Sequence, residues 1–149
     1  MLRHLKSVFA SFASHDVRYV IIGGVAAILH GVPRSTFDLD ILIDPTRANA
    51  ERLLAALADA GLGTASLTTV DELLSNVITV FQDRVRIDVQ TATPGIKFDQ
   101  VWERKVTMTF EGQSFFVLSK DDVVASKRAA GRPVDLQDAR LLRPGEEKK

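Results

Sequence analysis

Three aspartates in two apolar segments of the chain could hold divalent cations. Asp38 and Asp40 lie in the run DLDILI, and Asp88 lies in the run RIDVQ. If residues 38–43 form a strand, its two-residue period sends the carboxylates of Asp38 and Asp40 to the same face, with Cα atoms roughly 6.5 to 7 Å apart. Two such carboxylates repel unless a cation neutralises them, and Mg²⁺ prefers oxygen ligands of this kind. Two ions held in this way can clamp the attacking and leaving oxygens of a phosphoryl transfer.

The same aspartates also have a purely structural interpretation. An Asp-x-Asp pair is common by chance and could mark the polar end of a strand near a turn. Asp88 could be an exposed residue on a polar strand face, equivalent to Arg86 and Gln90. The three carboxylates converge only if their two strands lie side by side, and the sequence leaves this open.

A second feature suited to phosphate chemistry is the pair Gly23 and Gly24. The pair follows an apolar, β-branched run and precedes a short helical pattern. Free backbone N–H groups and the helix dipole at such a junction favour an anion, and glycine lets a phosphate approach without a Cβ in the way. The alternative is that a tight strand-to-helix turn requires glycine for steric reasons alone.

The elements that must position these residues alternate between strand and helix patterns. Strands are predicted at residues 17–22, 38–43, 77–81, 85–91, 106–110 and 114–118. Helices are predicted near the N-terminus, where Leu2, Leu5, Phe9 and Phe12 recur at helical spacing, and at residues 25–31, about 46–60, within 67–75, at 121–130 and from Pro133 onward. This pattern predicts an α/β (α+β) fold with a mixed sheet flanked by helices. We expect a single domain over residues 1–149, with C-terminal helices at about 120–142 and a polar tail at 143–149.

Composition excludes several classes of function. With 46% apolar and 26% charged residues, the chain has a globular composition, and its formal net charge of zero provides no strong basic field for extended nucleic-acid binding. There is no cysteine for a disulfide, a thiolate metal site or a nucleophile, and the three histidines show no metal-ligand spacing. No apolar run approaches the roughly 18 residues that a membrane span requires. A cytoplasmic protein without a membrane association is the expectation.

The order of these parts resembles the nucleotidyltransferases of the DNA polymerase β superfamily. Their signature is an apolar residue, Gly-Gly or Gly-Ser, a spacer, an Asp-x-Asp or Asp-x-Glu flanked by apolar residues, and a later third aspartate. This chain reads IIGG, then 13 residues, then DLDILI, and later RIDVQ. The resemblance implies that Asp38, Asp40 and Asp88 are the catalytic, metal-binding residues.

A closer resemblance is to the small nucleotidyltransferases of the AbiEii/AbiGii type, many of which are toxin components. They often carry GG-x-A followed by R-x-T-x-D-x-D, and a C-terminal K-x₃-G-R followed by D-x₂-D. The matching residues here are Gly23, Gly24, Ala26, Arg34, Thr36, Asp38, Asp40, Lys127, Gly131, Arg132, Asp135 and Asp138. The resemblance implies nucleotide binding by Gly23 and Gly24, by Arg34, Ser35 and Thr36, and by Lys127 and Arg132. For Lys127 and Arg132 the alternative is a local ion network with Asp135 and Asp138.

The activity implied is transfer of a nucleoside monophosphate from an NTP to a hydroxyl acceptor, with release of pyrophosphate. Two Mg²⁺ ions, or Mn²⁺ in their place, would be the cofactors. The acceptor could be an RNA 3′ end, a protein or a small molecule, and an antitoxin or a second copy of the chain is a candidate partner. The main rival is a non-catalytic module of the same fold that binds a nucleotide or a regulatory partner. A further rival is a generic α/β domain in which the motifs are coincidental.

Overall fold

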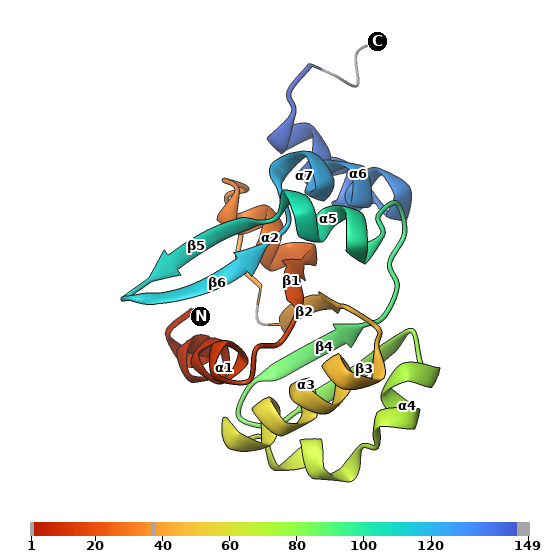
Figure 1. The fold of residues 1–149 in the computed structure, drawn as a ribbon. Helices are drawn as coiled ribbons and strands as arrows, with labels where there is room; N and C mark the ends of the chain where they lie inside the picture. Colours follow the sequence, from red (N-terminus) through yellow and green to blue (C-terminus); the bar gives the residue numbers. More distant parts are fainter. Residues whose placement is uncertain (1, 37, 146–149) are drawn as a thin grey trace.

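A six-stranded mixed sheet forms the centre of the computed structural model, which describes residues 2–36 and 38–145 (Figure 1). Across the sheet the strands follow the order β3-β4-β2-β1-β6-β5. The inner strands β2 and β4 are parallel, as are β1 and β6, whereas β1 and β2 are antiparallel. The strands are β1 (Tyr19–Ile22), β2 (Asp38–Ile43), β3 (Ile78–Gln82), β4 (Arg86–Gln90), β5 (Val106–Phe110) and β6 (Gln113–Val117). The predicted mixed α/β sheet flanked by helices is confirmed.

Helices α1 and α3 cover the sheet face opposite the three aspartates. Alternation along β2 and β4 buries Leu39 and Ile87 on that face. Helix α1 (Leu2–Ser14) packs Phe12 against Tyr19 of β1, with ring centroids 4.8 Å apart, and α1 also contacts α3 (Arg47–Asp59). The 3₁₀ turn η1 (Gly63–Leu67) and helix α4 (Val70–Ser75) follow α3 and lie beside it (Figure 1). This layer provides the apolar support for the strands that carry the aspartates.

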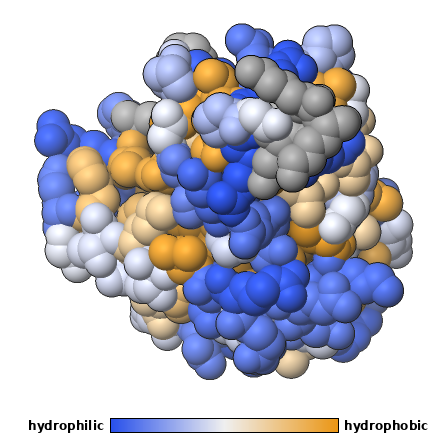
Figure 2. All heavy atoms as spheres, turned by 90° about the horizontal axis from the view of Figure 1, so that it is seen from above, coloured by the Kyte–Doolittle hydropathy of each residue, from blue (hydrophilic) through white to orange (hydrophobic). Residues whose placement is uncertain are grey.

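The remaining helices lie toward the opposite end of the molecule (Figure 1). They are α2 (Gly23–Leu29), α5 (Phe98–Arg104), α6 (Lys120–Ala130) and α7 (Pro133–Leu142). Gly131 ends α6 in the left-handed conformation, with φ of 71°, and Pro133 opens α7, as the sequence predicts. Seen from this side, hydrophilic side chains cover much of the surface, and the apolar patches between them are small and separate (Figure 2).

The structure differs from the sequence predictions at several element boundaries. Helix α5 was not predicted: Lys97 at its N-cap position makes no side-chain cap, so the usual helix-start signal is missing. Strand β1 begins at Tyr19 rather than at residue 17, because the N–H of Val17 donates to the carbonyl of Phe12 and closes helix α1. Helix α2 begins at Gly23 instead of residue 25. None of the helices in the described residues combines the length and apolar character of a membrane span.

Candidate active site

The register of strands β2 and β4 brings the three aspartates together. These parallel strands pair Asp40 with Asp88, and Asp38 with Arg86. Cross-strand partners point to the same side of a sheet, and neighbouring strands lie about 4.8 Å apart. The carboxylates of Asp40 and Asp88 are therefore lateral neighbours, with Asp38 two residues earlier on the same face. The side-by-side placement that the sequence left open is present.

Burial and the close approach of the three carboxylates change the pKa of Asp40. Its pKa is raised from 3.8 to about 7, first by burial and then by the charge and hydrogen bonding of Asp88, with a smaller contribution from Asp38. The nearby positive charge of Lys127 acts in the opposite direction. A carboxyl in this position gains from a bound cation, because a cation removes the repulsion that burial intensifies.

Arg86 supplies the positive charge on the other side of the aspartates. Its Nε donates to Oδ1 of Asp88 at 2.9 Å, and its Nη2 donates to Oδ2 of the same carboxylate at 3.3 Å. The Nε atom also lies 3.8 Å from Oδ2 of Asp38. Arg86 and Asp88 are two residues apart on β4 and so share a face of the strand. The sequence pattern predicted only that Arg86 lies on a polar strand face, although its two-residue spacing from Asp88 is the signal that could have revealed the pairing.

The glycine turn packs directly against the aspartates. Ile22 pairs with Asp40 across β1 and β2, and Gly23 follows it with φ of 68°. A Cβ at Gly23 would lie 2.5 Å from Oδ2 of Asp40, so the space left by the missing side chain is filled by that carboxylate. At Gly24 a Cβ would lie 3.3 Å from Nη2 of Arg34. Gly23 is thus required by both its backbone conformation and its contact with Asp40.

A buried ion network lies next to this turn and joins the loop before β2 to helices α6 and α7. Lys127 lies between two buried carboxylates, 3.0 Å from Asp138 and 3.4 Å from Asp135. The guanidinium of Arg34 donates two hydrogen bonds to Asp138, and that of Arg132 donates two to Asp135. Burial by itself would raise the pKa of both aspartates, but the hydrogen bonds and positive charges around them outweigh it and lower the pKa. The ion network that the sequence offered as an alternative for Lys127 and Arg132 is present.

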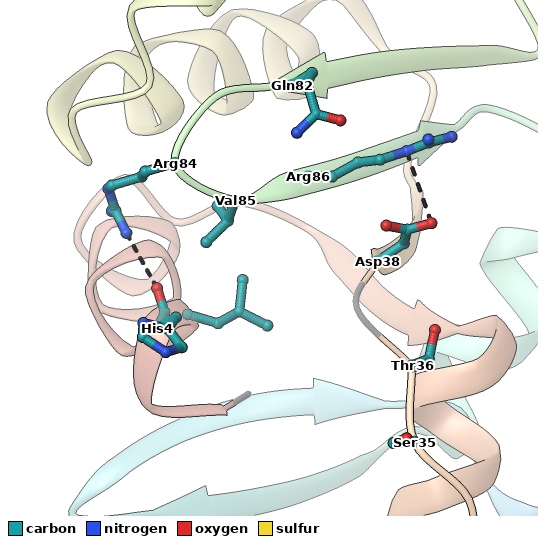
Figure 3. A pocket seen from close by; sticks show the side chains of 9 residues that line it. His4, Ser35, Thr36, Asp38, Gln82, Arg84, Val85 and Arg86 are labelled. Carbon is teal, nitrogen blue, oxygen red and sulfur yellow. Dashed lines mark hydrogen bonds and ion pairs between the residues drawn. The ribbon is translucent and has the colours of Figure 1, made fainter.

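A hollow of about 680 Å³ opens beside Asp38, whereas Asp40 and Asp88 do not line it. It lies between the first turn of α1, the segment that leads into β2, and the turn between β3 and β4 (Figure 3). Ser35, Thr36 and Asp38 line one side, and Arg84 and Arg86 line the other. Arg84 has a structural role, since its guanidinium donates to backbone carbonyls of His4 and Ala60 and to the hydroxyl of Ser7. The predicted binding residues Ser35 and Thr36 thus share a cavity with Asp38.

The donor set of the site suits a hard divalent cation. Asp38, Asp40 and Asp88 supply carboxylate oxygens, the ligands that Mg²⁺ and Mn²⁺ take in phosphoryl-transfer sites. Within the described residues, no group of three or more such side chains is already gathered closely enough to hold an ion. Two of the three carboxylates are engaged by Arg86, which donates to Asp88 and lies near Asp38. The residues fit a cation once these side chains turn toward it.

Comparison with known proteins assigns the chain to a family. No curated protein matches the sequence. A family model described as "Nucleotidyltransferase of unknown function (DUF6036)" matches residues 3–141. The matched region includes the glycine turn, the three aspartates and the ion network. The chain therefore belongs to this family of nucleotidyltransferases of unknown function.

Proposed function

We propose that the protein is a metal-dependent enzyme that moves a nucleoside monophosphate from an NTP to a hydroxyl acceptor and releases pyrophosphate. The observation that carries this proposal is the register of β2 and β4, which pairs Asp40 with Asp88 beside Asp38 and the glycine turn. Membership in a nucleotidyltransferase family supports the reaction class. A non-catalytic module would have no evident use for three carboxylates whose mutual repulsion needs a cation.

Asp38, Asp40 and Asp88 would hold two Mg²⁺ ions. When bound, these ions neutralise the charge that develops on the phosphate oxygens and lower the pKa of the attacking hydroxyl. Asp88 is our candidate for the group that receives the proton of that hydroxyl. The hydroxyl oxygen then forms a bond to the α-phosphorus, and the bond from the α-phosphorus to the pyrophosphate oxygen breaks. Most of the rate enhancement would come from positioning and charge neutralisation, without a covalent enzyme intermediate.

The triphosphate would lie at the glycine turn, between the carboxylates and the ion network. Arg34 lies against Gly24, and Arg132 keeps 72% of its side chain exposed, so both guanidinium groups can offer N–H donors to phosphate oxygens. Lys127 is buried between Asp135 and Asp138 and would act through its charge and by holding these two aspartates. Ser35 and Thr36, on the wall of the hollow, would contact the nucleotide or the acceptor as it enters.

The narrower assignment follows the resemblance to the AbiEii/AbiGii type. On that basis we propose that the enzyme acts on an RNA 3′ end, a protein or a small molecule, and that an antitoxin or a second copy of the chain is its partner. The ion network contains the residues of the K-x₃-G-R and D-x₂-D motifs on which this resemblance rests.

The test is a transfer assay with each NTP labelled in the α-phosphate, in the presence of Mg²⁺ and of cell RNA or cell protein. We expect an acceptor to become labelled by the wild-type protein and not by the Asp40→Asn variant, while the same NTP labelled in the γ-phosphate labels nothing. Transfer that persists in folded Asp40→Asn protein would refute the proposed role of the aspartates. Wild-type protein that binds an NTP but transfers nothing to any fraction would favour the non-catalytic module.

A further inference from the structure

Arg86 contacts two of the three aspartates. Its guanidinium makes two hydrogen bonds to Asp88 and lies within ion-pair distance of Asp38. Both carboxylates belong to the proposed metal site, and they come from two different strands. The close-up shows the Arg86 side chain extending along β4, with a dashed line that joins it to Asp38 of the neighbouring strand β2 (Figure 3).

The surroundings of Arg86 leave its side chain free to move. About 40% of the side chain is exposed, and Arg86 lines the hollow next to Asp38. The other arginine of the hollow, Arg84, is fixed by two backbone carbonyls and a serine hydroxyl, whereas Arg86 pairs, within residues 2–36 and 38–145, only with carboxylates. A guanidinium held by carboxylates alone is released when those carboxylates take another cation.

We propose that Arg86 is a resident counter-ion that competes with the divalent cation for Asp88 and Asp38. In the absence of metal it neutralises part of the repulsion among the three aspartates and keeps them from gathering around an ion. Metal binding must displace it, and the displaced guanidinium then lies in the hollow, where it can meet an anionic substrate. This inference rests on the proposed function, because it requires a metal at these aspartates.

The test is a titration with Mn²⁺ in the absence of nucleotide, followed by calorimetry or by the paramagnetic signal of free Mn²⁺. We expect Arg86→Gln to bind Mn²⁺ on the order of tenfold more tightly than the wild type, because the ion then no longer has to displace charge-assisted hydrogen bonds from Asp88. Arg86→Lys keeps the charge without the bidentate geometry and should fall between the two. Combining Arg86→Gln with Asp40→Asn should remove the gain, which would place the ion at the aspartates.

Arg104 provides the matched control. It makes two hydrogen bonds to Asp122, at 2.9 and 3.1 Å, outside the site. Arg104→Gln therefore breaks a pair of the same kind, and Mn²⁺ affinity should remain that of the wild type. Equal or weaker Mn²⁺ binding by both Arg86 variants would overturn the inference. If the Arg86 variants show no gain but the wild type still binds Mn²⁺ in an Asp40-dependent way, only the proposed role of Arg86 is refuted. Persistent nucleotide transfer by Asp40→Asn would instead refute the proposed function.

Discussion

Asp40 shows at the scale of one residue how a site can be built at the expense of stability. Asp40 is half-buried beside Asp88, and the pKa of its carboxyl is raised to about 7. In the metal-free protein, ionising the Asp40 carboxyl costs free energy that an apolar side chain at the same place would not cost. A cation that binds there as proposed would recover that energy.

This environment predicts a dependence of stability on pH. Because the pKa of Asp40 is about 7 in the folded protein and 3.8 in the unfolded chain, the folded state binds more protons between these values. The contribution of Asp40 to the free energy of unfolding therefore decreases as the pH rises from about 4 to about 7. Relative to the wild type, metal-free Asp40→Asn should gain on the order of 1–2 kcal/mol at a pH of about 8, after allowance for solvent screening, and little at about 4.

Urea denaturation of both proteins at a series of pH values measures this difference, in which the titratable groups that do not interact with Asp40 cancel. Saturating Mg²⁺ should reverse the order at high pH, because it stabilises the wild type alone. A constant difference between the two proteins across the pH range would contradict the environment described for Asp40.

Gly23 illustrates what residue type alone could and could not predict. The sequence indicated that glycine was needed at this turn, and the φ of 68° agrees. The sequence left two reasons open, room for a phosphate and the steric demands of a tight turn, and the structure adds a third, because the carboxylate of Asp40 fills the space next to Gly23. That contact joins two positions 17 residues apart in the sequence, so only the pairing of β1 with β2 could reveal it.

At the scale of elements, the ion network attaches the C-terminal helices to the site. Lys127 comes from α6, Asp135 and Asp138 come from α7, and Arg34 comes from the loop before β2. Two aspartates and one lysine are buried here, so each charge depends on its partners.

Removing the central charge of this network should destabilise the protein. Lys127→Met leaves two buried carboxylates without their shared cation, and breaking a buried ion pair in this way costs about 3–5 kcal/mol. Lys120→Met changes a lysine at the first turn of the same helix and should cost less than about 0.5 kcal/mol. The measurement is the free energy of unfolding of the three proteins in urea. Similar values for both variants would show that the network does not anchor α6 and α7.

Some elements of the fold could be predicted from the sequence, and others could not. Strand β2 was predicted with its observed bounds, and β4 was recognised because Ile87 and Val89 alternate with polar residues. Helix α5 was missed because it is short and lacks a side-chain cap. The sequence could not decide whether Lys127 binds phosphate or forms ion pairs, because the answer depends on how α6 and α7 pack against each other.

At the scale of the whole molecule, the strand order explains how the motifs become one site. The sheet places β1, β2 and β4 side by side, although 42 residues separate the end of β2 from the start of β4. The chain crosses the opposite face through α3 and returns in the β3–β4 hairpin, so that β4 joins β2 in parallel. The identity of the three aspartates was readable from the sequence, but their register was not, because periodicity within a strand says nothing about its neighbour.

Diffraction from crystals soaked in Mn²⁺, measured at a wavelength where Mn²⁺ scatters anomalously, tests the central claim most directly. We expect an anomalous peak among the carboxylates of Asp38, Asp40 and Asp88, with Arg86 turned away from Asp88. A peak at some other place, or none at a concentration that supports transfer, would contradict the metal site on which the proposed reaction depends.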